Sequence, residues 1–367
     1  MSDLFEIFLT GTPGLEPVLL AEARASGFAG ARLVPGGVSF EGTWPDVWRA
    51  NLVMRGATRV LARIGSFMAF HLAQLDKRAR KFPWAEVLRV DVPVRVEVAT
   101  SRRSKIYHAG AAAQRIEDGL KAAGYVVRPD APVVIKARID DNRVTFSVDT
   151  SGESLHKRGH KEAVGKAPMR ETLANLFLRS CGYDGTEPVL DPMCGSGTFV
   201  IEAAEIAAGL HPGRSRGFAF EHLATFDIDA WTEMREMGEV THPAVRFFGS
   251  DRDAGAVRMA TENAARAGVG DLTTFENLNA ADIQPPDGPP GLVICNPPYG
   301  GRIGNQKMLY GVYAGLGEAL KARFEGWRVG IVTSDAGLAK ATGLPLQKGP
   351  PVPHGGLKVR LFQTALK

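Results

Sequence analysis

The chain has 367 residues, of which 44% are hydrophobic and 23% charged, and its formal net charge is +4. This length is sufficient for two or three domains with a substantial core, and the composition is typical of a soluble globular protein. No run of about 18 uncharged apolar residues could span a membrane, and the first twenty residues contain three acidic and no basic side chains, unlike a secretory or transit peptide. We therefore expect a cytoplasmic protein without membrane contact.

The distribution of charge and the positions of the cysteines indicate which partners and which kinds of site to expect. Residues 1–160 carry 23 Lys and Arg against 17 Asp and Glu, a net charge of +6, whereas residues 161–367 carry 21 against 23, a net charge of −2. The positive excess in the front part favours a polyanionic partner there. Cys181, Cys194 and Cys295 are too few and too scattered for a disulfide framework or a zinc site, so we expect no metal and interpret them as small packed residues.

Residues 1–64 predict a small α/β piece. Apolar residues with alternating or helical spacing indicate strands at 5–9, 32–34, 38–40 and 59–64, and helices at 15–26 and 44–54. The second and third strands form a hairpin around Pro35, Gly36 and Gly37.

Residues 65–155 predict a second module that carries two basic clusters. We expect helices at 67–81 and 111–123, and strands at 93–99, 133–139 and 143–149, with a hairpin turn at Asp140, Asp141 and Asn142. The clusters comprise Lys77, Arg78, Arg80 and Lys81, and then Arg102, Arg103, Lys105 and Tyr107. One such cluster is more often a solvated helix end, but two in a positively charged module, one with an aromatic ring for stacking, favour a nucleic-acid interface. In the bridging stretch that follows, Lys157 and Arg158 could contact phosphate, although a linker explains them nearly as well.

Residues 156–367 predict the largest part, a mostly parallel sheet closed by an antiparallel hairpin. A helix is expected at 168–181, and strands alternate with helices from residue 188 onward. The expected strands lie at 188–190, 246–251, 273–276, 291–295, 328–333, 344–347 and 357–363, and the helices at 199–208, 254–267 and 309–324. A long interruption occupies about 209–243, and the proline-rich stretch 348–353 between the last two strands cannot join a sheet interior.

A glycine loop joins the strand at 188–190 to the next helix. It consists of Asp191, Pro192, Met193, Cys194, Gly195, Ser196, Gly197 and Thr198. Its glycines permit close backbone approach to a ligand, but Val200 replaces the third glycine of the dinucleotide pattern, which disfavours NAD. S-adenosylmethionine lacks a pyrophosphate, and Asp191 could bind its ammonium directly or through water. A nucleophilic role for Cys194 lacks a nearby His or a Cys-x-x-Cys pattern.

Two further acids complete the predicted donor site. Asp251 stands at the end of the next strand, where it could accept hydrogen bonds from the ribose hydroxyls. Asp227 and Asp229 in the interruption are competing candidates, and we favour Asp251 because the strand before it is clearly defined. Asp282 follows the strand after that and is placed to accept from the adenine amino group, although an isolated acid is more often a surface loop residue.

The quartet Asn296, Pro297, Pro298 and Tyr299 ends another apolar strand. Two prolines remove backbone donors and rigidify the turn, so carbonyl oxygens face outward. The Asn296 side-chain oxygen and the Pro297 carbonyl could hold both hydrogens of an exocyclic base amine and aim its lone pair at the methyl group, while Tyr299 stacks on the extruded base. The carboxyl ends of strands in one sheet share a rim, so we expect both motifs to form one site.

These motifs together resemble the THUMP-domain class I methyltransferases, and among them the bacterial 23S rRNA guanine-N2 methyltransferases in their unfused form. The resemblance also includes Gly36-Gly37-Val38-x-Phe40, Leu155-His156-x-Arg158-Gly159 and Ala167-Pro168-x-x-Glu171-Thr172-Leu173-Ala174. It implies a ferredoxin-like front piece, a THUMP module that binds RNA, and a seven-stranded Rossmann-like catalytic domain. It also implies that Pro168, Arg170 and Glu171 border the donor pocket. The second methyltransferase of the fused form is expected to be absent.

The resemblance implies methyl transfer from S-adenosylmethionine to guanine N2 in structured RNA, with 23S rRNA as the preferred substrate. A tRNA guanine-N2 methyltransferase is the nearest alternative, because the motifs do not separate the two. DNA adenine-N6 methylation uses the same quartet, and a non-catalytic RNA-binding assembly factor with a retained donor pocket is a third reading.

Overall fold

The computed structural model describes residues 4–161, 169–237, 241–299 and 306–367. The chain forms two compact units, each of which draws on several segments. The first contains Met1–Gly11, Glu22–Leu155 and Arg216–Met237, and the second contains Thr12–Ala21, His156–Ser215 and Gly238–Lys367. Within the described ranges, no helix is long and apolar enough to cross a membrane.

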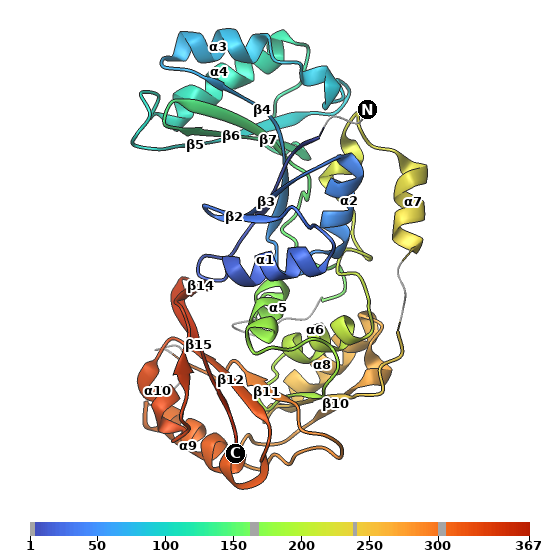
Figure 1. Cartoon of the computed structure of the whole chain (residues 1–367), viewed down its shortest axis with the longest axis vertical. Helices are drawn as coiled ribbons and strands as arrows, with labels where there is room; N and C mark the ends of the chain where they lie inside the picture. The colour runs from blue at the N-terminus through green and yellow to red at the C-terminus, as the bar shows by residue number, and fades with distance from the viewer. Residues whose placement is uncertain (1–3, 162–168, 238–240, 300–305) are drawn as a thin grey trace. The chain divides into compact units, whose positions relative to one another are not determined.

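One seven-stranded sheet runs through the whole first unit (Figure 1). Its order is β2-β3-β1-β4-β7-β6-β5, and all neighbours are antiparallel except β5 and β6. The strands are β1 Phe5–Thr10, β2 Arg32–Val34, β3 Gly37–Gly42, β4 Arg59–Met68, β5 Val94–Thr100, β6 Val133–Asp140 and β7 Arg143–Asp149. Strand β4 continues past residue 64, the predicted boundary between the first two pieces, and it pairs with β1 on one side and β7 on the other. The two pieces therefore share one sheet, and their division at 1–64 and 65–155 remains a prediction.

One helix of the first unit begins later than its sequence predicts. The helices of this unit are α1 Glu16–Ala25, whose first residues belong to the second unit, α2 Trp44–Val53, α3 Leu72–Arg80, α4 Ala109–Ala122 and α7 Ile228–Glu236, with short 3-10 helices at Trp84–Glu86 and Ala219–His222. Strand β4 continues to Met68, so the helix expected from residue 67 begins only at Leu72. His71 caps it, because its ring nitrogen Nδ1 accepts the Gln74 N–H at 3.3 Å. Helices α3 and α4 lie side by side (Figure 1), and Gly119 allows their close approach at Ala79.

The predicted interruption at 209–243 is not unstructured, because its middle completes the core of the first unit. Phe220 and Trp231 are buried with ring centroids 5.0 Å apart, and Phe220 also stacks on Trp48 at 6.2 Å. Asp227 caps helix α7, because its carboxylate accepts the N–H groups of Asp229 and Ala230. Part of the aromatic core of the first unit therefore comes from Arg216–Met237, a segment far along the sequence.

The second unit is built on a sheet in the order β10-β9-β8-β11-β12-β15-β13, with β14 paired to β15. The strands are β8 Val189–Asp191, β9 Phe247–Ser250, β10 Thr273–Glu276, β11 Leu292–Cys295, β12 Arg328–Thr333, β13 Gln347–Lys348, β14 Val352–His354 and β15 Leu357–Ala365. The first five in spatial order are parallel and β15 is antiparallel to β12, which confirms the predicted mostly parallel, Rossmann-like sheet. The strand expected at 344–347 is reduced to β13. Part of the proline-rich stretch instead forms β14, where Pro353 sits at an edge position that tolerates its missing donor.

Helices cover both faces of this sheet (Figure 1). They are α5 Glu171–Ser180, α6 Thr198–Ala207, α8 Ala254–Arg266, α9 Gln306–Arg323 and α10 Ala336–Ala341, with a 3-10 turn at Gly270–Leu272. Helix α10 is short, is capped by Asp335, and was not predicted from the sequence. Strands β8 and β11 are neighbours from which the strand order runs in opposite directions. This switch point is where open α/β sheets bind ligands, so the loops after β8 and β11 mark the candidate site.

Candidate active site

The glycine loop after β8 has the backbone that its sequence predicts. Gly195 and Gly197 adopt φ angles of 52° and 85°, in the left-handed region that glycine occupies without strain. The Cys194 N–H donates to the Ser250 carbonyl at 2.9 Å, and the buried Asn263 amide donates to the Ser196 carbonyl at 3.1 Å. The loop is thus fixed to the end of β9 and to α8 before any ligand binds.

Asp191 and Asp251 both face this loop. Asp191 is buried and its carboxylate accepts the Met193 N–H at 3.0 Å; burial raises its pKa well above the ordinary value. Asp251 accepts the Gly195 N–H at 3.0 Å through one oxygen and the Asp253 N–H at 2.9 Å through the other. The structure therefore brings Asp251 to the glycine loop, as the sequence indicated.

The other acidic candidates lie elsewhere. Asp227, the competing ribose ligand, caps α7 in the first unit. Asp282 follows β10 and is exposed, with its Oδ2 accepting from the Asn279 amide at 3.3 Å. Its role toward adenine remains a prediction. Burial raises the pKa of the Cys194 thiol, and the neighbouring Asp191 raises it further, so this cysteine has no thiolate character.

The turn after β11 presents an unused acceptor. Among the described residues, the Asn296 side-chain oxygen is buried and has no hydrogen-bond partner. Buried polar atoms are normally paired, so an orphaned acceptor at a strand end suggests a ligand donor. The Pro298 carbonyl accepts from the Tyr313 hydroxyl on α9 at 3.4 Å, a contact that the sequence did not reveal. Burial raises the pKa of Tyr299 to about 12, so its phenol is neutral at physiological pH.

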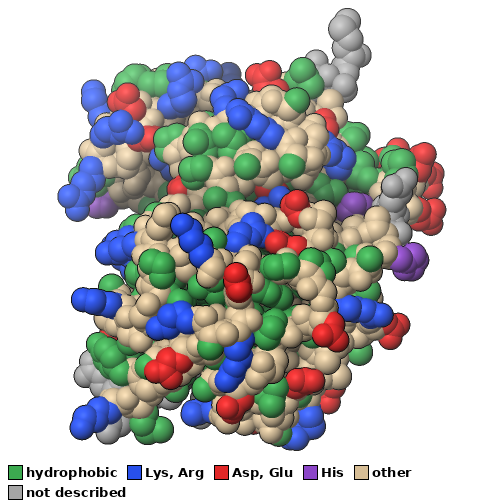
Figure 2. Space-filling view, turned by 60° about the horizontal axis from the view of Figure 1, so that its bottom comes forward, with side chains coloured by type: hydrophobic (Ala, Val, Ile, Leu, Met, Phe, Trp, Pro, Cys, Tyr) green, Lys and Arg blue, Asp and Glu red, His purple; other side chains and the backbone are tan. Residues whose placement is uncertain are grey.

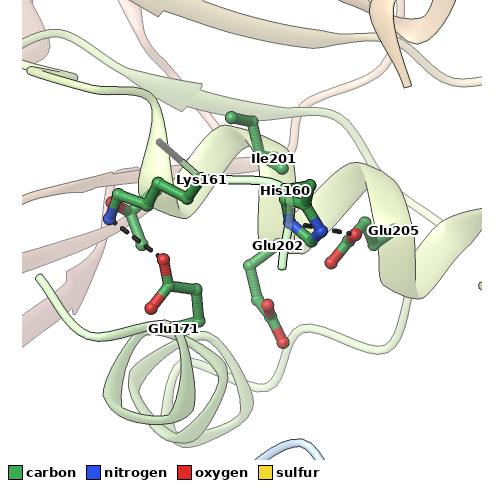
Figure 3. A pocket seen from close by; sticks show the side chains of 7 residues that line it. His160, Lys161, Glu171, Ile201, Glu202 and Glu205 are labelled. Carbon is green, nitrogen blue, oxygen red and sulfur yellow. Dashed lines mark hydrogen bonds and ion pairs between the residues drawn. The ribbon is translucent and has the colours of Figure 1, made fainter. Parts of the chain in front are cut away.

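A buried polar cluster adjoins Thr198, the last residue of the glycine loop, and Figure 3 shows it from close by. Its small cavity is lined by His160, Lys161, Glu171, Thr198, Ile201, Glu202 and Glu205. A volume of about 10 Å³ leaves room for about one water, far too little for a nucleoside, so this cavity is not the donor pocket. Lys161 contacts the loop residue Thr198 and the α5 residue Glu171, a role that its place in the sequence does not reveal.

Arg158 was predicted to contact RNA, and the structure corrects this. Its side chain is 0% exposed and forms an ion pair with Glu202 at 3.0 Å in the interior of the second unit. A guanidinium buried in this way cannot reach a phosphate. Lys157 is exposed, as the prediction requires. Of the residues implied to border the donor pocket, Glu171 is the first residue of α5, Arg170 is the N-cap before it, and Pro168 lies outside the described residues.

The two basic clusters lie on the first unit. Lys77, Arg78, Arg80 and Lys81 are exposed on and just after α3, and Arg80 pairs with Asp76 at 2.9 Å. The second cluster is fastened to the β6–β7 turn, because the Lys105 N–H donates to Asn142 at 2.9 Å and Arg103 pairs with Asp140 at 2.8 Å.

Aromatic rings accompany the second cluster. Tyr107 is 63% exposed, and the Lys105 ammonium lies 5.6 Å from the centroid of the exposed Phe70 ring. On the face that Figure 2 shows, Lys and Arg side chains are spread widely with Asp and Glu among them. The exposed aromatic rings therefore distinguish this basic cluster from the rest of the charged surface better than its charge does.

Two family models match parts of this chain. Residues 158–348 match the family described as RMKL-like, methyltransferase domain, and residues 6–61 match the RlmL ferredoxin-like domain. A candidate RNA methyltransferase of Synechocystis is 32% identical over 98% of this chain and 96% of its own length. The ribosomal RNA large subunit methyltransferase K/L of Syntrophotalea carbinolica is 36% identical over 97% of this chain but only 53% of its own length. The chain thus spans about half of the K/L relatives.

Two solved structures share the whole architecture. One, described as a predicted N6-adenine-specific DNA methylase from Listeria monocytogenes, is 28% identical with a TM-score of 0.86, covering 100% of this chain and 97% of its own. The protein SMU.472, solved in complex with SAH, is 27% identical with a TM-score of 0.86, covering 100% of this chain and 99% of its own. The sheet order, the glycine loop and these matches together show that the chain belongs to the RlmKL-like family of S-adenosylmethionine-dependent methyltransferases.

Proposed function

We propose that this chain transfers a methyl group from S-adenosylmethionine to the exocyclic N2 of a guanine in structured RNA, with 23S rRNA as the preferred substrate. The observation that carries the acceptor assignment is the buried side-chain oxygen of Asn296 after β11, which has no hydrogen-bond partner in the part of the chain that the structure describes. Strand β11 pairs directly with β8, so this oxygen and the glycine loop follow adjacent strands. A site with a donor pocket and an amine acceptor side by side is what methyl transfer to nitrogen needs.

The residues around the glycine loop fit the donor. When bound, S-adenosylmethionine supplies a methyl group on a positively charged sulfur. The buried Asp191 offers a carboxylate whose ionised form is disfavoured without a nearby cation, which the donor's ammonium would provide. Asp251 retains lone pairs for ribose hydroxyls while its hydrogen bonds to Gly195 and Asp253 hold it in place.

The acceptor turn can prepare an amine for attack without strong base catalysis. The Asn296 oxygen and the Pro297 carbonyl would accept the two hydrogens of the amine and direct its lone pair at the methyl carbon. As the N–C bond forms, the S–C bonding electrons stay with sulfur, and the excess proton leaves the product nitrogen to water. The neutral Tyr299 would contribute ring stacking instead of proton transfer. Positioning of this kind supplies up to about 7–11 kcal/mol.

RNA is supported by two independent features. The K/L relatives are named for ribosomal RNA, and the first unit carries basic clusters with exposed aromatic rings. The choice of guanine N2 comes from the family resemblance, and the K/L relatives extend beyond this chain. The decisive experiment is therefore chemical identification of the product.

The test is incubation of the purified chain with labelled donor and RNA from cells that lack its gene, followed by digestion and mass spectrometry. N2-methylguanosine in 23S rRNA is the expected product, and the same nucleoside in tRNA alone would support the tRNA alternative. In a parallel incubation with genomic DNA from the same cells, labelled N6-methyladenine in the DNA without labelling of the RNA would overturn the proposal. An Asn296→Ala variant should bind RNA normally and incorporate no label.

A further inference from the structure

Lys161 connects three segments around the glycine loop of the second unit. Its ammonium donates to the Thr198 hydroxyl at 2.8 Å and to the Met169 carbonyl at 3.2 Å, and it pairs with the Glu171 carboxylate at 3.1 Å. Figure 3 shows the Lys161 and Glu171 side chains pointing toward one another. An ammonium has three donor hydrogens, so these contacts use its full capacity.

The ion pair between Lys161 and Glu171 is shielded from solvent. The Lys161 side chain is 9% exposed and that of Glu171 is 10% exposed, so water and salt screen their attraction little. Thr198 is the first residue of α6 and directly follows Gly197, the last glycine of the loop. The contact therefore acts on the end of the loop. The middle of the loop is held separately, because Asp251 accepts the Gly195 N–H and Asn263 donates to the Ser196 carbonyl.

The electrostatics argue against a role in stabilising α6 alone. The N-terminus of a helix carries partial positive charge, so a cation placed there is unfavourable by itself. Glu171 offsets this charge and stands favourably in the first turn of α5. Because the Lys161 ammonium opposes the dipole of α6, its bond to Thr198 points to a role in holding the glycine loop.

We propose that Lys161 is a positioning residue for the methyl donor. Its ammonium ties the end of the glycine loop to the start of α5 and so holds the loop in the shape that receives the methionine end of the donor. This inference rests on the proposed function only in placing that donor at the glycine loop. Lys161 acts through Thr198 and Glu171 without needing to touch the donor.

The test is the affinity for SAH measured by calorimetry, together with the melting temperature, for the full chain and its variants. Lys161→Met should weaken SAH binding about 10-fold or more, a difference of about 1.4 kcal/mol. Thr198→Val retains the Lys161–Glu171 pair but loses the bond to the loop, and it should weaken binding in the same direction, including where Lys161→Met fails to fold. Glu187→Gln is the matched control, because it breaks an ion pair with Arg328 elsewhere in the same unit. It should lower the melting temperature and leave SAH affinity unchanged.

A double variant separates positioning from simple charge balance. Leaving one charge of a buried pair alone is costly, whereas removing both is nearly neutral, so Lys161→Met/Glu171→Gln should recover stability relative to Lys161→Met. We expect its SAH affinity to stay low. Recovery of both properties would overturn the inference, as would wild-type affinity in Lys161→Met. If the wild-type chain bound no SAH, the proposed function would fall with it.

Discussion

Replacing Asn296 by leucine should separate stability from activity. In the free protein the Asn296 side-chain oxygen is buried without a partner among the described residues, and an unsatisfied buried group costs about 1–3 kcal/mol. Leucine has a similar volume and no such acceptor. We therefore expect Asn296→Leu to be as stable as the wild type or more stable by about 1 kcal/mol. For a unit of this size that gain raises the melting temperature by roughly 2–4 °C.

The same substitution should abolish catalysis. Loss of one preorganised hydrogen-bonding group at a reacting centre typically lowers the rate about 10²–10³-fold. Methyl transfer to RNA should fall by at least that factor, while SAH affinity changes little, because Asn296 would act on the acceptor. The assays are thermal unfolding, calorimetric SAH binding and label incorporation into RNA.

Asn263 provides the matched control for stability. It is also an asparagine of the second unit, but its buried amide donates to the Ser196 carbonyl and its oxygen accepts from Arg266. Asn263→Leu should therefore destabilise the protein by about 1–3 kcal/mol. If Asn296→Leu lost as much stability as Asn263→Leu, the Asn296 amide would be a structural turn element. Retention of wild-type transfer would refute its assigned role.

Three further outcomes follow from the site and the basic surface. Burial raises the pKa of Asp191, so SAH affinity should fall as pH is lowered through a value above the ordinary 3.8 for aspartate, and Asp191→Asn should flatten that profile. The folded protein binds the Asp191 proton more tightly than the unfolded chain does, so the stability of the ligand-free protein should decline as pH rises through the same range. Asp191→Asn should remove that decline, and a pH–stability profile unchanged by this substitution would contradict the assignment. Tyr313→Phe removes the hydroxyl that holds the Pro298 carbonyl, so transfer should slow about 3- to 10-fold at constant SAH affinity, the size expected for a net hydrogen bond of about 1 kcal/mol. Arg102→Glu with Lys105→Glu should weaken RNA binding and its salt dependence without changing SAH binding; equal RNA affinity in a filter-binding assay would remove this surface from the interface.

Local sequence patterns predicted most strands and helices, and they failed where distant partners decide the outcome. The alternation of β4 continues past Ile64 because β7 pairs with it through Met68, which a local pattern does not reveal. The hairpin turn at Asp141 and Asn142 was predictable, since both residues tolerate the positive φ angles of 49° and 61° that they adopt.

The candidate site shows the same contrast between features that local sequence predicts and features that depend on distant partners. The glycine loop and the proline turn carry their chemistry in the order of their residues, so sequence alone placed them at strand ends. Lys161 and Arg158 belong to one basic stretch, and the sequence does not distinguish their roles. Only the fold shows that Arg158 is buried in an ion pair with Glu202, and that Lys161 contacts Glu171 and Thr198. Likewise the exposed Phe70 becomes relevant only beside Lys105.

The late segment that completes the first unit also constrains how the chain folds during synthesis. Trp48 finds Phe220 and Phe226 as its aromatic neighbours only after residues 216–237 exist. The ribosome must add 82 residues between Leu155 and Met237, which takes roughly 4–16 s at about 5–20 residues per second. During that interval the nascent first unit exposes an indole that its finished core buries. We therefore expect the first unit to complete its fold only after residues 216–237 have been synthesised.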